Sequence, residues 1–101
     1  MNTAFEEALG SSPQIKVLDY LLSWEGFDVT ITDIAKGSKI SRVKTYSVVK
    51  SLIRKGVLIP TRNIGNANFF KLDGNNIFTK QLRKLYRTCV KQSIKELEGE
   101  K

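Results

Sequence analysis

Apolar side chains recur three and four positions apart in the first third of the chain, which is the spacing of an amphipathic helix. Within residues 13–25 the apolar positions are Ile15, Leu18 and Leu22, with Val17, Leu21 and Trp24 widening the same stripe. Ser12 is a suitable N-cap, and Pro13 fits the first helical position because the N–H group that it lacks has no partner there. The pattern therefore predicts a first helix over residues 13–25.

A second, shorter helix is predicted after the residues "GFDV", which break the apolar pattern and can form a short strand. In "TITDIAKGS", Thr30 and Asp33 have the spacing of a capping box, with Asp in place of the usual Glu or Gln. Ile31, Ile34 and Ala35 supply an apolar face. This helix should be only about two turns long.

The stretch "ISRVKTYSVVKSLIRKGVL" predicts a third helix over residues 42–55. Ser41 can cap its start, and Gly56 can end it after Arg54 and Lys55, whose charges suit the negative end of the helix dipole. Its buried stripe is expected to consist of Thr45, Val48, Val49 and Leu52.

A two-stranded ribbon is predicted over residues 57–72. The strand-like runs "VLIPTRNI" and "NFFKL" flank Gly65 and Asn66, which tolerate the positive φ of a hairpin turn. Pro60 has no N–H for a sheet ladder, so its N side should face an edge. Leu58 is expected in the core.

The longest helix is predicted from about residue 76 to residue 98. One broad side of it carries the apolar residues Phe78, Leu82, Leu85, Tyr86, Cys89, Val90, Ile94 and Leu97. The other side carries the basic residues Lys80, Arg83, Lys84, Arg87, Lys91 and Lys95. A domain this small offers little surface to cover a helix of more than about 20 residues, or about 30 Å, so we expect the apolar side to pair two subunits, with Phe5 and Leu9 contributing. The alternative is that it packs only onto its own domain.

These elements predict a mainly α fold with a small β-hairpin wing, followed by a long C-terminal helix. We expect an N-terminal segment or arm over residues 1–12, a compact domain over 13–73 and a dimerisation element over 74–101. No run of the sequence approaches the roughly 18 apolar residues of a membrane span, and the acidic N-terminus does not have the pattern of a secretory signal. A cytoplasmic place beside the nucleoid is expected.

The charge of the chain is concentrated in its middle. The net charge is +7, and the segment between Asp33 and Asp73 holds nine basic residues and no acidic one. The rest of the chain holds eight basic residues and all ten acidic ones. Such asymmetry indicates a surface for nucleic acid or for an anionic membrane.

The third helix shows this charge asymmetry most clearly. With Thr45 to Leu52 buried, its outer side carries Val43, Ser47, Lys50 and Arg54, flanked by Lys44, Tyr46 and Ser51. Exposed helices usually mix charges, because opposite charges four residues apart contribute about 0.2–0.5 kcal/mol per pair. This helix forgoes every such pair, which favours a nucleic-acid surface over a merely solvated one.

The order helix, short strand, helix, tight turn, basic helix, hairpin resembles the winged helix-turn-helix domain of small archaeal and bacterial transcription regulators, broadly the MarR, ArsR and TrmB-like group. The resemblance rests on "PQIKVLDYLL", "TITDIAKGSKISRVKTYSVVKSLIRKGVL" and "TRNIGNANFFKLD", within residues 13–73. It implies a repressor-type regulator, a homodimer, that inserts the basic helix in the major groove of double-stranded DNA and lays the wing on the backbone or in the minor groove.

Carried onto this chain, the resemblance implies groove contacts from Ser41, Arg42, Val43, Lys44, Tyr46, Ser47 and Lys50, and wing contacts from Arg62, Asn63, Asn66 and Asn68. Lys39 in the preceding turn and Arg54 complete the expected DNA-binding surface, Arg54 for the phosphate backbone or the helix dipole. For Tyr46, a phosphate-binding phenol and a partly packed aromatic ring are both open.

Two departures from the family pattern bear on these expectations. The turn before the basic helix often carries Gly where this chain has Lys39, and a left-handed backbone there would be strained by about 1 kcal/mol, so a turn of different shape is expected. The chain has no His and one Cys, so the ligand sets of metal-sensing members are absent, and neither a metal nor another cofactor is expected.

Other function classes have less support. No phosphate-binding Gly-rich loop, no His base and no paired carboxylates near a nucleophile are present, so the chain is not expected to be an enzyme. No small-molecule ligand is expected. Two alternatives remain: an architectural or DNA-segregation protein that spreads along DNA, and a winged-helix module for protein contacts in a transcription or repair assembly. RNA binding is also open, although the sequence suggests no exposed aromatic cluster for base stacking.

Overall fold

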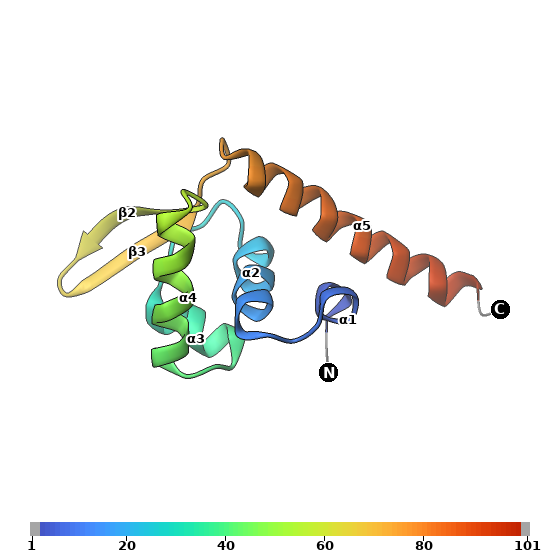
Figure 1. Cartoon of the computed structure of the whole chain (residues 1–101), viewed down its shortest axis with the longest axis horizontal. Coiled ribbons are helices and arrows are strands. Elements are labelled where there is room, and N and C mark those ends of the chain that lie inside the picture. The colour runs from blue at the N-terminus through green and yellow to red at the C-terminus, as the bar shows by residue number, and fades with distance from the viewer. Residues whose placement is uncertain (1–2, 100–101) are drawn as a thin grey trace.

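The computed structural model describes residues 3–99 of the chain and has five helices and three strands within them. In chain order the elements are α1 (Ala4–Leu9), α2 (Pro13–Ser23), β1 (Val29–Thr30), α3 (Ile31–Ser38), α4 (Arg42–Arg54), β2 (Leu58–Ile64), β3 (Ala67–Leu72) and α5 (Ile77–Gly99) (Figure 1). The predicted fold class, mainly α with a β-hairpin wing and a long C-terminal helix, is confirmed. The N-terminal segment contains the short helix α1.

The helices begin where the sequence places a capping side chain. Thr30 and Asp33 form the full capping box of α3: the Thr30 hydroxyl accepts from the Asp33 N–H at 3.1 Å, and the Asp33 carboxylate accepts from the Thr30 N–H at 3.0 Å. Ser12 and Ser41 each accept from the N–H three residues further on, at 3.2 Å and 3.1 Å. These bonds satisfy donors that the first turn leaves free, and they fix where α2, α3 and α4 start.

Helix α4 ends as predicted, through Gly56. This glycine has φ +74°. The N–H of Val57 donates to the carbonyl of Leu52, and the N–H of Gly56 donates to the carbonyl of Ile53, both at 3.0 Å. This pair of bonds is the Schellman motif. Val57, the residue after Gly56, is buried, so the chain enters the core directly after α4 and continues into β2.

Helix α3 ends by the same motif without a glycine. Lys39 takes the left-handed conformation, with φ 59° and ψ 43°, and the N–H of Ile40 donates to the carbonyl of Ala35 at 3.2 Å. The expectation of a differently shaped turn was wrong. A second backward bond runs from the N–H of Lys39 to the carbonyl of Lys36 at 3.3 Å. These two bonds and the packing of Ile40 against the core stabilise the turn despite the lysine.

The three strands form one antiparallel sheet in the order β1-β3-β2. Val29 pairs with Phe70, and Leu58 pairs with Leu72, so the short strand after α2 and the hairpin share a sheet. The hairpin closes through Gly65 and Asn66, with φ +60° at the glycine. Strand β2 is an edge strand, as the prediction for Pro60 requires.

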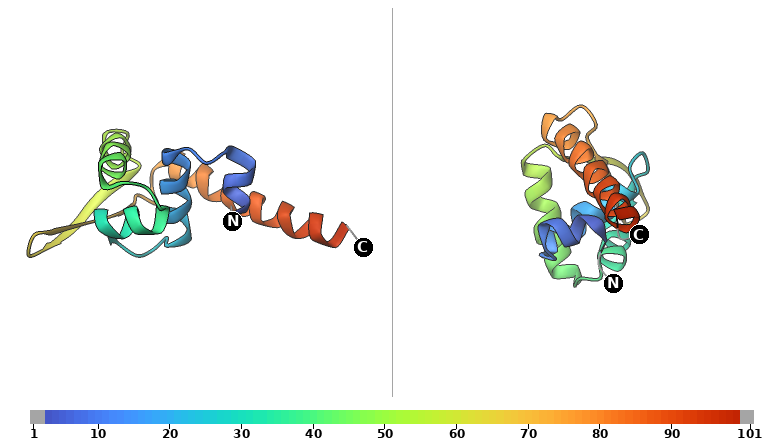
Figure 2. Two further views of the ribbon diagram at one scale, coloured as in Figure 1. Left: turned by 90° about the horizontal axis from the view of Figure 1, so that it is seen from below. Right: turned by 90° about the vertical axis from the view of Figure 1, so that its right-hand side faces the viewer.

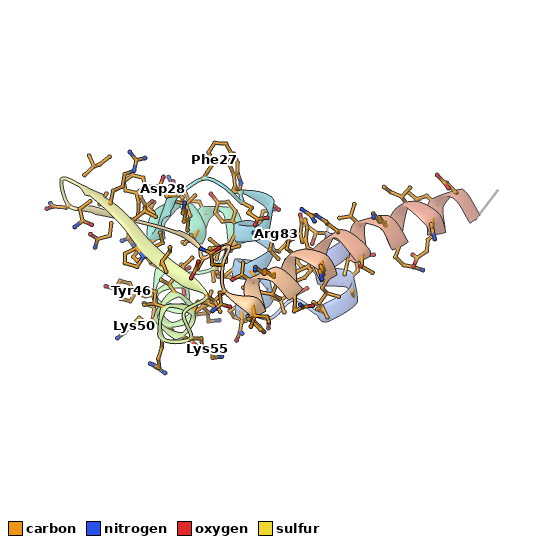
Figure 3. All side chains as sticks on the ribbon, turned by 90° about the horizontal axis from the view of Figure 1, so that it is seen from above. Phe27, Asp28, Tyr46, Lys50, Lys55 and Arg83 are labelled. Atoms are coloured by element: carbon orange, nitrogen blue, oxygen red, sulfur yellow. The ribbon has the colours of Figure 1, made fainter. Side chains whose placement is uncertain are left out.

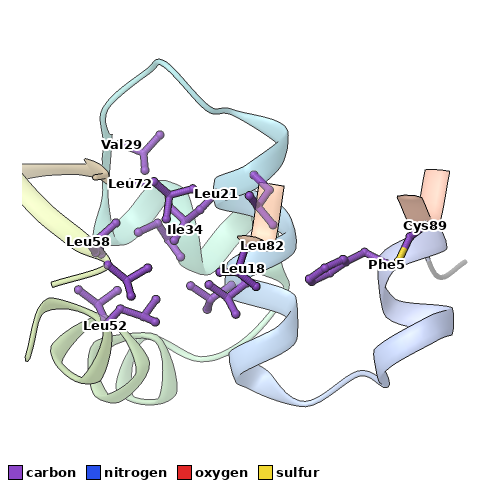
Figure 4. Packing of buried hydrophobic residues seen from close by; sticks show 14 residues of the cluster. Phe5, Leu18, Leu21, Val29, Ile34, Leu52, Leu58, Leu72, Leu82 and Cys89 are labelled. Carbon is purple, nitrogen blue, oxygen red and sulfur yellow. The ribbon is translucent and has the colours of Figure 1, made fainter. Parts of the chain in front are cut away.

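The main core lies where α2, α3, α4 and the base of the sheet meet (Figure 4). Its largest fully buried side chains include Val17, Ile34, Val49, Leu52, Val57 and Leu58. Thr45 is also fully buried, and its hydroxyl donates to the Ser41 carbonyl at 2.8 Å. The predicted inner stripe of α4 and the core position of Leu58 are confirmed, with Val48 only partly buried.

Trp24 departs from the predicted apolar stripe of the first helix. Helix α2 stops at Ser23, and Trp24 is its C-cap, with 50% of its side chain exposed. Its ring lies between those of Tyr20 and Phe27, at centroid distances of 6.3 Å and 6.1 Å. An exposed aromatic cluster therefore does exist, at the end of α2, where the sequence did not suggest one.

Helices α2 and α3 pack closely because one position between them has no side chain. A Cβ at Gly37 would overlap the ring of Tyr20, with even Cζ only 2.9 Å away. Gly37 is therefore needed for helix packing, while Lys39, two residues later, supplies the left-handed turn.

Helix α5 starts beside the end of α4 and runs away from the sheet, beyond α1 (Figures 1 and 2). Asn76 anchors its start: the side-chain amide donates to the Gly56 carbonyl at 3.1 Å, and its oxygen accepts from Phe78 and Thr79 N–H groups at 2.9 Å and 3.2 Å. The molecule is 53 Å long as a result.

Within residues 3–99, no helix combines the length and hydrophobicity that a transmembrane segment needs.

Helix α1 packs against the middle of α5. Phe5 is 1% exposed and packs against Tyr86, with ring centroids 5.6 Å apart. The Tyr86 hydroxyl lies 2.9 Å from the Ser23 hydroxyl of α2. The expected role of Phe5 between two subunits was wrong, because this ring is already buried inside its own subunit; Leu9 remains exposed.

Candidate nucleic-acid interface

The outer face of α4 is a continuous exposed surface of basic and small side chains. Thr45, Val49 and Leu52 anchor the inner side of the helix in the core. Residues that line a shallow hollow on the outer side are Arg42, Val43, Tyr46, Ser47, Lys50 and Arg54. Val43, in the first turn of α4, is 81% exposed, although contact of an apolar side chain with water is unfavourable. The face therefore offers cations, hydroxyls and one apolar group to a partner.

Tyr46 and Lys50 also face the wing. Together with Arg42, they line a groove of about 750 Å³ between α4, the start of α3 and the hairpin. The wing side of this groove is formed by Ile64, Asn66, Ala67, Asn68 and Phe70. Tyr46 is 56% exposed, so its ring is partly packed against the protein and partly open to solvent. The groove joins the outer face of α4 to Asn66 and Asn68, two of the predicted wing residues.

Arg42 is held in position by the helix before it. Its Nη1 donates to the Thr32 hydroxyl at 2.9 Å. Thr32 lies within the capping box of α3, between Thr30 and Asp33, so the rigid start of one helix orients a cation on the next. Arg42 lines both the groove and the outer hollow of α4, and its remaining guanidinium donors can bind a phosphate or a base edge.

A second group of cations gathers at the other edge of α4. Lys39, Ser41 and Lys44 line a depression together with Lys16 from α2. Sequence reasoning missed Lys16, because it lies far from the acid-free segment. The signal that could have found it is its position in the first turn of α2, close to Ser12 and Pro13.

Arg62 of the wing is engaged by a residue outside the hairpin. Its Nε and Nη2 donate to the two carboxylate oxygens of Asp28 at 2.8 Å and 3.2 Å, and its guanidinium lies 4.6 Å from the centre of the Phe69 ring. Thr61 donates to the same carboxylate at 2.7 Å. These bonds, chiefly the one from Arg62, hold the pKa of Asp28 below its usual value.

A β-bulge allows two consecutive wing residues to reach one carboxylate. The register of β2 against β3 slips between Pro60 and Arg62, so Thr61 has no partner across the ladder. In a regular strand, neighbouring side chains point to opposite faces. Asp28 lies on the far side of the hairpin from Tyr46 and Lys50 (Figure 3), so this contact supports the wing from behind.

The cations of α4 are free of acidic partners. In residues 3–99 the ion pairs are Arg62 with Asp28 and Arg83 with Glu25, and neither involves α4. An exposed cluster of unpaired cations creates a positive potential that attracts polyanions.

All thirteen residues predicted to bind DNA are exposed. The structure gathers most of them in two adjoining regions, the outer face of α4 with the wing groove and the Lys16–Lys39–Lys44 depression. Arg62 instead lies against Asp28, and Asn63 does not line the groove. Thr32 and Asp28, which position Arg42 and Arg62, were missed because they lie 10 and 34 residues away in sequence.

The eight residues predicted for dimerisation divide into two groups. Leu82 and Cys89 are buried within the subunit, and Tyr86 is partly buried against Phe5. The exposed residues of the set are Phe78, Leu85, Val90, Ile94 and Leu97. Only the second group is free to meet another subunit.

Comparison with known proteins defines the fold. No family model matches the chain, and no curated protein matches it in sequence. Among solved structures, MepR, a transcription regulator of the Staphylococcus aureus multidrug efflux pump MepA, superposes with a TM-score of 0.71 at 16% identity, over 97% of this chain and 73% of MepR. A MepR variant bound to an oligodeoxyribonucleotide gives 0.66 at 17% identity, over 95% of this chain and 69% of that one.

The adhesin competence repressor AdcR of Streptococcus pyogenes gives a TM-score of 0.65 at 21% identity, over 86% of this chain. The chain spans 62% of the length of AdcR. Identities this low establish the fold alone. The chain has the winged helix-turn-helix fold found in MarR-family regulators.

Proposed function

We propose that this chain is a sequence-specific, double-stranded DNA-binding protein that acts as a dimeric transcription regulator. The observation that carries the proposal is the outer face of α4, which is exposed, free of acid and fixed to a rigid core through Thr45, Val49 and Leu52. The winged-helix fold and the DNA-bound MepR variant of the same fold support it. A regulator of this kind works beside the nucleoid, in the cytoplasm, and performs no catalysis.

The N-terminal half of α4 enters the major groove. Arg42 and Lys44 reach base edges or adjoining phosphates, Val43 can pack on a thymine methyl group, and Ser47 can donate to a base or a phosphate. Lys50 and Arg54 follow the backbone as the helix leaves the groove. Phosphate contacts position the protein and base contacts give the sequence preference.

The wing lies along the flanking backbone or in the minor groove. Asn66 and Asn68 line the groove between wing and α4, where a strand of the duplex can pass. Arg62 holds the hairpin against Asp28, which sets the angle of the wing, while more than half of its side chain, 56%, is still open to a phosphate. The DNA-binding unit is therefore residues 13–73.

Two subunits pair through α5, in the segment 74–101. Val90, Ile94 and Leu97 form the exposed apolar part of this helix beyond the cover of α1. A two-fold pair places two recognition helices in successive major grooves, about 34 Å apart, and selects an inverted repeat.

Selection of bound sites from a random duplex library tests this proposal. We expect one enriched inverted repeat with half-site centres about 10 base pairs apart. Binding without any enriched sequence would favour the architectural protein that spreads along DNA. No binding to duplex at low salt would overturn the proposal in favour of a protein-contact module, whose basic face meets an acidic partner.

A further inference from the structure

A second basic surface lies on α5, outside the interface described above. Its members are Lys80, Lys84, Arg87, Lys91 and Lys95, the α5 stripe. They follow one another at intervals of four, three, four and four residues, which keeps them on one side of the helix. All five are exposed. The stripe is about 22 Å long, at 1.5 Å per residue.

The stripe faces away from the body of the subunit. Leu82 and Cys89, two buried positions of α5, each follow a stripe residue by two positions, which is about 200° around the helix. The exposed apolar residues Val90 and Ile94 lie at one edge of the stripe, on the side of Arg87. Pairing of two subunits through those residues places Arg87 at the rim of the contact and leaves Lys80, Lys84, Lys91 and Lys95 open to solvent.

No acidic group neutralises the stripe. The sequence has no acid between Asp73 and Glu96, and none of the five cations forms an ion pair within residues 3–99. Glu98 lies in line with the stripe and marks its end. The one cation of this helix segment that is paired, Arg83, lies off the stripe and contacts Glu25.

The spacing of these cations opposes helix formation unless a partner is present. Like charges three and four residues apart repel, and the stripe contains four such pairs in succession. Glutamine or mixed charges would keep an exposed helix equally soluble without the repulsion. A linear polyanion relieves all four repulsions at once, whereas a compact acidic group would reach only one or two cations.

We propose that the α5 stripe binds the phosphate backbone of a second DNA segment, so that one protein joins two duplexes. The inference rests on the proposed function of α4, which brings the first duplex. The wing and the free end of α5 lie at opposite ends of the molecule, so a duplex on the stripe need not be the one held by α4 (Figure 1). An anionic membrane is a poorer match, because the apolar residues of α5 lie beside and behind the stripe and several are buried.

The test is a bridging assay with the full chain, an immobilised duplex and a labelled free duplex. The stripe variant is Lys84→Gln with Lys91→Gln. Its matched control, Lys36→Gln with Lys71→Gln, removes the same charge from exposed positions on α3 and β3. Circular dichroism checks that both remain folded. We expect the stripe variant to bind the immobilised duplex within about twofold of wild type but to capture at least about tenfold less free duplex, while the control captures both.

Lys84→Arg with Lys91→Arg should restore capture, since the contact requires charge. Capture by the stripe variant equal to that of the control would overturn the inference and leave the stripe a solvated surface. Binding of wild type to phosphatidylserine vesicles without any capture of a second duplex would overturn it in favour of a membrane.

A variant of α4, Lys44→Ala with Lys50→Ala, separates failure of this inference from failure of the proposed function. If that variant still binds duplex and the stripe variant does not, α5 is the principal DNA surface: the proposal for α4 fails and the joining of two duplexes fails with it, while DNA binding by the stripe stands. If the α4 variant loses all duplex and the stripe variant bridges normally, the inference for α5 fails alone. If wild type binds no duplex, both fail.

Discussion

Asp28 and Arg62, 34 residues apart in sequence, form a two-point ion pair that ties the wing to the loop before β1. The β-bulge at Thr61 adds a third bond to the same carboxylate. The base of the hairpin is fixed in the core by the buried side chains of Leu58 and Leu72, and β3 pairs with the two-residue strand β1. The ion pair adds a further contact, which holds the outer part of β2 to the loop before β1.

The charge state of Asp28 should follow this contact. Its folded pKa lies below the unfolded value, so the ion pair stabilises the fold above the unfolded pKa of about 3.9 and is lost as pH falls through the lower folded pKa. In Arg62→Gln the titration midpoint of the Asp28 carboxyl carbon, followed by NMR, should rise towards the value of an ordinary aspartate. An unchanged midpoint would mean that Arg62 is not the main cause.

Lys39 should show opposite effects on stability and on binding. Lys39→Gly relieves a left-handed residue and should stabilise the fold by up to about 1 kcal/mol, measured by urea unfolding. The same change removes a cation from the edge of α4, so DNA affinity should fall.

Lys39→Asn is the matched control, since Asn tolerates the left-handed conformation but carries no charge. It should lose affinity as Lys39→Gly does, while gaining less stability. Full affinity in both variants would remove Lys39 from the DNA-binding surface.

Gly37 should tolerate no side chain. Gly37→Ala places a methyl group into the ring of Tyr20, and overpacking of this kind destabilises by about 1–3 kcal/mol. Thermal unfolding measures the loss. Gly99→Ala is the control, because nothing lies within 4 Å of a Cβ at that position. Equal melting temperatures for the two variants would contradict the packing described for α2 and α3.

Self-association should depend on the far half of α5. Ile94→Gln with Leu97→Gln changes side chains that are 50% and 68% exposed, so the subunit should stay folded while sedimentation equilibrium shows a monomer in place of a dimer. Phe78→Gln, also exposed but at the start of α5, should remain a dimer. A dimer in both variants, or a monomeric wild type, would count against pairing through residues 90–97. Truncation near residue 79 is a poorer test, because it also uncovers Phe5.

The local signals in the sequence were sufficient for most of the fold. Ser12, the Thr30 and Asp33 pair, Ser41 and Gly56 each act within a few residues, so capping motifs predicted the starts of α2, α3 and α4, and a stop motif predicted the end of α4. Periodicity predicted the buried side of α4 for the same reason. The residues exposed on that helix followed once its inner stripe was known.

Two of the three errors involve contacts between distant segments. Phe5 was expected between subunits, but α1 folds back on α5 and buries its ring against Tyr86. Trp24 fits the stripe of α2 by spacing, yet α2 ends one residue before it. Lys39 was expected to avoid the left-handed region, but the packing of Ile40 outweighs a local strain of about 1 kcal/mol.

The candidate site was predictable in outline only. The sequence indicated which residues of α4 face outward, because the helical period determines it. It could not indicate that Thr32 orients Arg42, that Asp28 holds Arg62 or that Lys16 joins Lys39 and Lys44, since each contact joins separate elements.

The central claim is that α4 binds the phosphate backbone and bases of DNA, and the salt dependence of affinity tests it most directly. Affinity for a selected duplex is measured from low to physiological salt for wild type, for Lys44→Ala with Lys50→Ala, and for the equally charged control Lys36→Ala with Lys71→Ala. The α4 variant should bind more weakly than wild type. Its slope of log affinity against log salt should flatten by up to about 0.9 for each phosphate that it no longer neutralises. The control should keep the wild-type slope. An α4 variant with the affinity and slope of the control would contradict the account.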